Sequence, residues 1–394
     1  MSVVPATGAA GRAVDRLVLS TPDAFLASVP HMVGFDCADS VVLVGLGPNP
    51  GDRMDRSGMV RLVQRFDTPP PDTSGGDLVS IAQAAAEPMA RSGSTEVIVA
   101  VFGGTPAPGT ELPSAVLVDE LLTRIDDAGL GVRDALFTDG TSRWSYGCDN
   151  PSCCPPEGRV IPETTRTLVA AEFAGVGAAM APSRAALVDE IAPDRARIAA
   201  VDTFTVDLRP PAGAASEGLE QWRDSTLDHL TAVAGSADAP VGPREAAWAL
   251  QGLHDIRVRD TFLWDIAQPG TDSRAVADRL ADLVRCAPPG QVAPAATVLA
   301  IAQWSSGDGA RANVALDRAQ ADDPDYSLAH LVGSALRSGL PPSTWAASLA
   351  DLERDTCRHG TREFTSPAPA PAATAPAPVL DPYGVTGPST GLAS

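Results

Sequence analysis

The chain has 394 residues and a mass of 40.4 kDa, which is larger than one hydrophobic core usually becomes, so we predict two domains. Its hydrophobic share of 44% and charged share of 20% exclude a wholly disordered or fibrous protein. The net charge of -20 opposes contact with a phosphate backbone. All 29 basic residues are arginines, which excludes mechanisms that need a Schiff-base or Walker-type lysine.

The sequence lacks the usual signals for secretion or membrane insertion. Residues 1–20 contain no cationic segment followed by a continuous apolar stretch. The longest apolar runs, Val41–Leu46 and Val97–Phe102, have the length of strands and are too short to cross a bilayer. We therefore predict a cytoplasmic protein without membrane contact, whose six cysteines are thiols or metal ligands rather than stable disulfides.

The first 165 residues alternate between strand patterns and helix patterns. Continuous runs of β-branched residues indicate strands that are covered on both faces. The predicted strands are 17–19, 40–46, 59–66, 96–102, 132–138 and 141–146, and the predicted helices are 24–29, 78–91 and 113–128. This order predicts an α/β domain over residues 15–165, preceded by a flexible lead at residues 1–14.

Prolines and glycines predict several local features of this domain. Pro30 begins a turn after the first helix, and Pro88 kinks or interrupts the second. Asp139-Gly140 is the two-residue turn of a β-hairpin. Gly45–Gly47 and Gly103–Gly104 follow apolar strands, where an open α/β sheet places its ligand crevice. Neither run continues into a dinucleotide or phosphate-binding motif, so nucleotide binding is not predicted.

Beyond about residue 161 the strand patterns fade and helical periodicity replaces them, so we predict a mostly helical domain over residues 180–358. Its helices are predicted to begin near Ser216, Pro243 and Asp272. Residues 298–336 resemble a tetratricopeptide-type helix pair followed by one further helix, without a second copy. The proline- and alanine-rich segment 365–394 is predicted to be disordered.

The loop that follows the predicted hairpin is the part most indicative of chemistry. Cys148, Cys153 and Cys154 lie within seven residues, among prolines and glycines that fix their directions. Zinc takes four ligands, normally including pairs two to four residues apart. Adjacent cysteines seldom bind one metal ion together, so the loop supplies two ligands, Cys148 and Cys153. A complete site would need Cys37, His31 or another distant group.

Two alternatives to a metal remain open for this loop: a reversible Cys148–Cys153 disulfide, and a reactive Cys154 thiolate activated by nearby arginines. The interpretation that we prefer is structural, because buried thiols in a proline-braced loop packed against Trp144 and Tyr146 account for the residue types. If the loop is instead a site, its candidate binding residues are Trp144, Tyr146, Cys148, Cys153, Cys154 and Glu157.

Two further candidates lie before the strand 40–46. His31 would act as a base, although a histidine that caps a loop is the simpler interpretation. Asp36, together with Asp39, would bind a cation or a polar ligand, although aspartates in turns ordinarily accept hydrogen bonds from local backbone. The sequence contains neither a Gly-x-Ser-x-Gly elbow nor a His-Glu-x-x-His motif.

Three segments carry a resemblance to a known family: PHMVGFDCADSVVLVGL, WSYGC followed by CCPPEG, and GDGARANVALDRAQADDPDYSLAHLV. They resemble the actinobacterial domain of unknown function 4192, over about residues 15–350. In that family histidine and proline commonly follow the Gly-Phe pair, where this chain has Asp36 and Cys37, so the resemblance does not imply metal ligands at these two positions. It implies a shared architecture and supplies no activity.

These observations predict a binding or interaction protein, with an α/β domain that binds a ligand and a helical domain that binds a protein partner. The alternative is a thiol- or metal-dependent enzyme that uses the Cys148, Cys153 and Cys154 loop, although the sequence yields no complete catalytic set. No cofactor is predicted, and zinc at this loop is the one alternative. Because the arginines are scattered and the net charge is -20, we expect no binding to nucleic acid.

Overall fold

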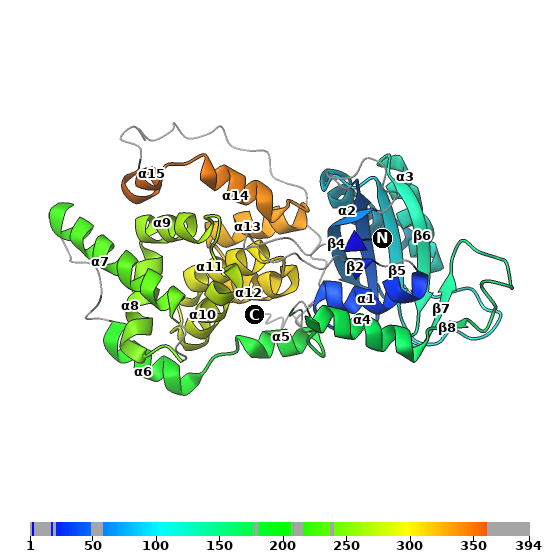
Figure 1. The fold of residues 1–394 in the computed structure, drawn as a ribbon, viewed down its shortest axis with the longest axis horizontal. Helices are drawn as coiled ribbons and strands as arrows, with labels where there is room; N and C mark the ends of the chain where they lie inside the picture. Colours follow the sequence, from blue (N-terminus) through cyan, green and yellow to red (C-terminus); the bar gives the residue numbers. More distant parts are fainter. Residues whose placement is uncertain are drawn as a thin grey trace, which may run out of the picture.

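The protein is described by a computed structural model over residues 2–3, 17–18, 21–48, 58–175, 177, 180–205, 208, 216–236 and 240–360. A sheet with flanking helices comes first in the chain, and a helical region follows beside it (Figure 1). This arrangement confirms the predicted fold class. The predicted disordered segment 365–394 lies outside the described residues, as does the predicted flexible lead 1–14 apart from Ser2 and Val3.

Within the described residues, eight strands form one mixed sheet in the order β2-β1-β4-β3-β5-β6-β7-β8. Their bounds are β1 Ser2–Val3, β2 Leu17–Val18, β3 Ser40–Gly47, β4 Met59–Asp67, β5 Glu96–Phe102, β6 Gly131–Thr138, β7 Ser142–Ser145 and β8 Arg159–Val160. β3 runs antiparallel to both of its neighbours, β4 and β5. β5 and β6 are parallel, and β7 and β8 complete this side of the sheet in antiparallel pairs.

Helices cover both faces of the sheet. α2 (Gly75–Arg91) and α3 (Ala115–Asp127) pack on one face, and α1 (Pro22–Val33) packs on the other. Side chains of β3 alternate between the two cores, with Leu43 in the first and Val44 in the second. The continuous apolar run of β3 therefore belongs to a strand that is buried on both faces, as predicted.

Gly45 and Gly47 lie in the last part of β3, whereas Gly103 and Gly104 follow β5 at the opposite end of this strand pair, so one ligand crevice cannot lie beside both runs. The strands are antiparallel, and Leu46 near the end of β3 is paired with Glu96 at the start of β5. Gly45 has a packing role instead, because a Cβ there would lie 2.2 Å from the Ser94 hydroxyl oxygen.

Both prolines that were predicted to interrupt helices lie inside continuous helices. α1 runs through Pro30 to Val33 and ends at Gly34, whose φ of 93° is left-handed. α2 runs through Pro88 to Arg91. The prediction that the first helix ends before Pro30 is wrong, and Pro88 does not interrupt α2, because packing of each helix against the sheet outweighs the hydrogen bond that a proline removes.

The β6–β7 hairpin is present, but its turn is displaced by one residue from the prediction. Thr138 is paired with Arg143, and the Asp139 N–H donates to Ser142 O at 3.3 Å, so the two central residues are Gly140 and Thr141. Gly140 has a φ of 86°, which a glycine adopts without strain. The Asp139 carboxylate accepts the backbone N–H groups of the turn, which explains why aspartate occupies the position before it.

The rest of the described chain consists of helices. Their bounds are α4 Glu163–Gly175, α5 Arg184–Glu190, α6 Arg195–Thr205, α7 Ser216–Gly235, α8 Pro243–His254, α9 Ile256–Ile266, α10 Ser273–Cys286, α11 Val292–Ser305, α12 Gly309–Asp322, α13 Ser327–Arg337, α14 Pro342–Ala350 and α15 Arg354–His359. α4 packs against α1, and the described residues beyond it contain no strand of the sheet. The predicted helix pair and the helix that follows it correspond to α11, α12 and α13. No helix within the described residues has the length and apolar character needed to span a bilayer.

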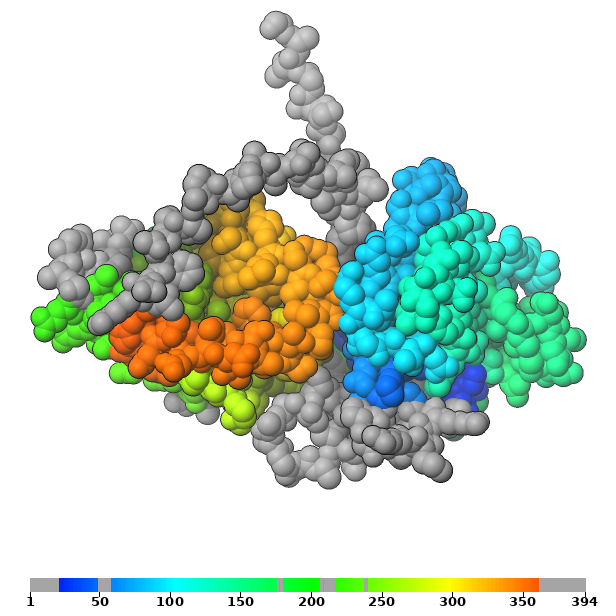
Figure 2. All heavy atoms as spheres, turned by 90° about the horizontal axis from the view of Figure 1, so that it is seen from above, coloured from blue at the N-terminus to red at the C-terminus, as the bar shows by residue number. Residues whose placement is uncertain are grey.

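The α/β and helical regions are joined by specific contacts. Phe35, which follows α1, belongs to the core of the helical region, and the guanidinium of Arg65 on β4 lies 5.3 Å from the centre of its ring. On another side, the Arg91 side chain at the end of α2 donates to Ser338 O at 3.3 Å. Figure 2 shows this second contact zone, where the segment that follows α13 lies against α2. The two regions therefore touch at more than one place.

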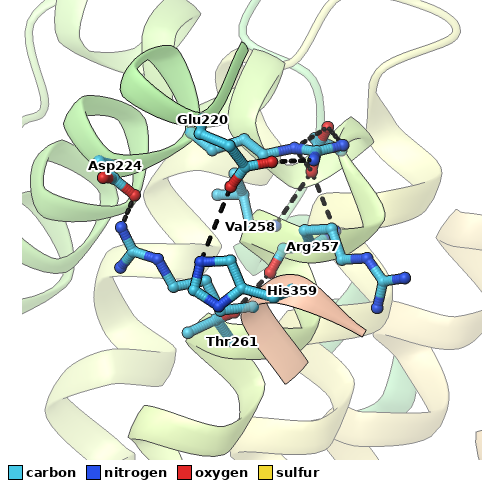
Figure 3. Close-up of polar contacts among 9 residues, drawn as sticks. Glu220, Asp224, Arg257, Val258, Thr261 and His359 are labelled. Carbon is cyan, nitrogen blue, oxygen red and sulfur yellow. Dashed lines mark hydrogen bonds and ion pairs between the residues drawn. The ribbon is translucent and has the colours of Figure 1, made fainter. Parts of the chain in front are cut away.

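A polar network joins α15 to the helices α7 and α9. Figure 3 shows Glu220 and Asp224 of α7 facing α15, where His359 Nε2 lies 3.9 Å from a Glu220 carboxylate oxygen and Arg358 forms an ion pair with Asp224. Beside them, Asp255 accepts backbone N–H groups at the start of α9. Arg223 of α7 forms an ion pair with Asp255, and Arg354 of α15 forms one with Asp265 of α9, so the network holds these three helices together.

Candidate functional site

The cysteine loop begins at β7 and is anchored by Trp144. The indole ring is buried and packs tilted against Phe137, with 5.7 Å between ring centres. Its Nε1–H donates to Pro156 O at 3.1 Å, on the far side of the loop. Gly158 has a φ of 82°, and a Cβ there would lie 2.4 Å from the indole. Trp144 therefore fixes both ends of the loop relative to the sheet.

Tyr146 provides a second anchor. Its hydroxyl donates to Pro113 O at 2.5 Å, before α3, and its ring packs against the core beneath. Burial raises the pKa of the Tyr146 hydroxyl, so it stays protonated and remains a donor at neutral pH. Trp144 and Tyr146 therefore position the loop. This packing agrees with the predicted contact between the loop and these two side chains.

Between the anchors, Asn150 organises the segment that carries the cysteines. The backbone N–H groups of Cys153 and Cys154 donate to Asn150 O at 3.1 and 2.8 Å. The Asn150 side-chain oxygen accepts the N–H of Ser152 at 3.0 Å. These bonds turn the chain back, so that Cys153 and Cys154 approach Cys148 across the loop.

The three cysteine sulfur atoms converge at the surface. Cys148 Sγ lies 3.1 Å from Cys153 Sγ, Cys153 Sγ lies 3.8 Å from Cys154 Sγ, and all three lie within 4.8 Å of one another. Cys153 is exposed, and the other two are half-buried. Two sequence-based expectations are therefore corrected, because the thiols are not buried and the adjacent Cys154 joins the other two.

The protonation of this cluster is shared among its members. A hydrogen bond from Cys153 holds the pKa of the half-buried Cys148 thiol below its usual value. Partial burial, together with the neighbouring sulfurs, raises the pKa of Cys154 to about 12. These shifts favour the thiolate form at Cys148 and disfavour it at Cys154.

The other candidate residues lie apart from these sulfurs. Within the described ranges, the group of side chains placed to hold a metal ion contains the three cysteines and no histidine or carboxylate. His31 stacks on Phe173 of α4 with 4.9 Å between ring centres, and burial lowers its pKa. Cys37 is fully buried, and burial raises its pKa to about 12. Asp36 and Glu157 are exposed. Neither His31 nor Cys37 completes a site at the loop.

Two arginines near the loop, Arg143 and Arg166, are engaged with acidic partners. Arg143 forms an ion pair with Asp23 of α1, and Arg166 forms one with Glu163. The guanidinium of Arg166 also donates to Gly140 O at 2.7 Å. These pairs reduce the positive potential around the cysteines, so the absence of nucleic-acid binding stays our prediction.

Three convergent thiols have the dimensions of a metal site. At a Zn–S distance of about 2.3 Å, ligand sulfurs at the corners of a tetrahedron lie about 3.8 Å apart. The Cys153–Cys154 pair already has this separation, and the Cys148–Cys153 pair at 3.1 Å needs a small opening. A fourth position would face solvent, as it does in zinc sites that bind an exchangeable ligand.

Comparison with known proteins identifies the family of this chain but does not indicate an activity. No curated protein matches the chain, and no solved structure matches it. A family model described as a domain of unknown function, DUF4192, matches residues 22–343, which extend from α1 through α13 and include the cysteine loop. Because this match covers most of the chain and agrees with the resemblance of its three segments, the protein belongs to the DUF4192 family.

Proposed function

We propose that this is a metal-binding protein that holds a thiophilic divalent ion, with Zn²⁺ as its representative, at Cys148, Cys153 and Cys154. The observation that carries the proposal is the convergence of the three sulfur atoms within 4.8 Å at the surface. Thiolates are soft ligands that favour zinc and copper(I) over magnesium or calcium. A divalent ion among three thiolates would also offset the mutual repulsion that opposes their ionisation.

The arrangement supports ion binding better than the alternative of an enzyme. A thiol-dependent enzyme needs a base or an oriented donor beside its nucleophile. Within the described residues, the sulfur cluster includes no histidine or carboxylate, and His31 is stacked elsewhere on Phe173. A metal ion needs only the donors that the loop already brings together.

Removing one thiol tests this proposal. The full chain, purified under reducing conditions, is expected to bind one Zn²⁺ in competition with a chromophoric chelator. We expect Cys154→Ser to lower the Zn²⁺ affinity at least about 100-fold, because losing a ligand costs more than losing a residue that only hydrogen-bonds to a ligand. Ser152→Ala is the matched control, since it alters the same exposed loop and keeps every thiol. Equal affinity of Cys154→Ser and the wild type would contradict a three-thiolate site.

We also propose that the helical region binds a protein partner, through an open hollow of about 570 Å³ beside α6. Its lining combines apolar and oppositely charged side chains: Pro193, Arg195, Ile198, Ala199, Asp202, Pro288 and Pro289. A surface of this composition suits a partner segment with apolar residues flanked by charge.

The partner proposal predicts that Ile198→Asp lowers partner affinity about tenfold or more without changing the melting temperature, because a carboxylate would be desolvated at the contact. Partners captured by the wild-type chain from its own cells would be identified, purified and titrated against both proteins. Leu331→Asp, which alters an exposed leucine on α13, is the control. Unchanged affinity for the Ile198 variant would exclude this hollow as the binding surface.

A further inference from the structure

Cys148 and Cys153 are arranged as a pair that can form a disulfide. Their sulfur atoms are 3.1 Å apart, so they must approach by about 1 Å to reach the bond length of about 2.05 Å. Four residues separate them in the chain, and the hydrogen bonds of Asn150 already close the turn between them. The loop therefore needs only a small adjustment to bring the two sulfurs into contact.

A disulfide between the adjacent cysteines, Cys153 and Cys154, is disfavoured by backbone geometry. Cα atoms of adjacent residues such as Cys153 and Cys154 are about 3.8 Å apart across a trans peptide. Disulfides usually require a Cα separation of about 4.4–6.8 Å. The shorter sulfur–sulfur distance also favours Cys148 as the partner of Cys153. Cys154 is then left as a free thiol beside the bonded pair.

Exposure makes this pair selectively accessible to an oxidant. Cys153 is exposed, whereas Cys37, Cys286 and Cys357 are buried. The anchors of the loop do not involve the sulfurs, because Trp144 bonds to Pro156 O and Tyr146 bonds to Pro113 O. Oxidation can therefore change the state of the loop while the surrounding fold is kept.

We propose that the loop has an oxidised state in which a reversible Cys148–Cys153 disulfide replaces two of the three thiolates. The release of a bound metal ion on oxidation, which rests on the proposed function, follows because one remaining thiol cannot hold it. The loop would then couple metal occupancy to the thiol–disulfide balance of its surroundings. The oxidant is a low-molecular-weight disulfide of the glutathione class.

The internal disulfide forms by thiol–disulfide exchange in two steps. The exposed Cys153 sulfur attacks the external disulfide, which breaks its S–S bond, forms a mixed disulfide and releases one small thiol. The Cys148 sulfur, 3.1 Å away, then attacks Cys153 Sγ, forms the internal bond and displaces the second small thiol. Two protein thiols are oxidised, one external disulfide is reduced, and the two thiol protons end on the released molecules.

Peptide mapping of the full chain tests the proposal. The protein is treated with oxidised glutathione, its free thiols are blocked with an alkylating reagent, and its peptides are analysed by mass spectrometry. We expect a Cys148–Cys153 linkage that a dithiol reductant reverses. Cys154→Ser should form the same linkage, whereas Cys153→Ser should not form it. A Cys148–Cys154 linkage, a stable glutathione adduct or free thiols throughout would overturn the proposal.

Zinc is measured in the same samples, so that failure of the metal-site proposal can be distinguished from failure of the disulfide proposal. Zinc bound by the reduced protein and released in step with the disulfide supports both. Zinc binding without the disulfide overturns the redox inference and keeps the metal site. The disulfide in a chain that binds no zinc when reduced overturns the metal site and keeps the redox pair. Cys357→Ser is the control that removes a buried thiol outside the loop.

Discussion

Replacing Trp144 with alanine is expected to lower the free energy of unfolding by about 3–5 kcal/mol, the usual cost of deleting a buried aromatic side chain. The indole is 7% exposed, packs against Phe137 and donates to Pro156 O. Its removal leaves a cavity beneath the loop and releases the Pro156 contact. The same substitution is expected to weaken Zn²⁺ binding, because the sulfurs lose their common anchor. Urea unfolding and the chelator competition measure the two effects.

Trp144→Phe separates packing from hydrogen bonding. Phenylalanine retains most of the ring contact with Phe137 and loses the indole N–H, so its cost should be nearer the roughly 1 kcal/mol of one hydrogen bond. If Trp144→Ala left the stability unchanged, the loop would not be held by this side chain. If Trp144→Ala bound zinc as tightly as the wild type does, Trp144 would have no role in positioning the sulfurs.

Asp282→Ala is expected to lower the free energy of unfolding by about 3 kcal/mol, because it leaves the half-buried guanidinium of Arg197 without its carboxylate partner. Asp282 of α10 accepts from Arg197 Nη2 of α6 at 2.9 Å and from the Val241 N–H at 2.8 Å. Its side chain is 13% exposed. The single carboxylate therefore links three segments of the helical region. Asp317→Ala, which breaks an exposed ion pair with Arg184, is the control and should cost less than about 1 kcal/mol.

The effect of Asp282 should depend on pH. Burial raises the pKa of this carboxyl, but the bonds from Arg197 and Val241 outweigh burial, so its pKa lies below the ordinary value of 3.8. A carboxyl with a lowered pKa stabilises the fold above 3.8, and this contribution is lost as the pH falls through the folded-state pKa. The stability difference between wild type and Asp282→Ala should therefore shrink below this pH. A difference that stays constant down to pH 2 would contradict the ion pair.

Local patterns predicted most of the elements and the change from sheet to helices. The alternation of Leu43 and Val44 between two cores follows from a continuous apolar run. The order and direction of strands depend on contacts between distant segments. The placement of β3 between two antiparallel neighbours was therefore not predictable, and this placement separates the two glycine runs that the sequence had suggested as the border of one crevice.

The arrangement of the cysteine loop could also be predicted only in part from the sequence. The spacing of Cys148, Cys153 and Cys154 indicated chemistry, but it predicted only two metal ligands. Convergence of the third sulfur depends on the turn at Asn150 and on the bond between Trp144 and Pro156. Tertiary packing also holds His31 against Phe173. The sequence had suggested His31 as a base or as a distant metal ligand.

X-ray absorption at the zinc edge, on the full chain loaded with one Zn²⁺ under reducing conditions, tests the three-thiolate site most directly. The expected result is three sulfur neighbours at about 2.3 Å and one lighter atom at the open position. Cys154→Ser should replace one of these sulfurs with a lighter atom. A zinc ion surrounded only by nitrogen and oxygen, or the same number of sulfurs in wild type and variant, would contradict metal binding by Cys148, Cys153 and Cys154.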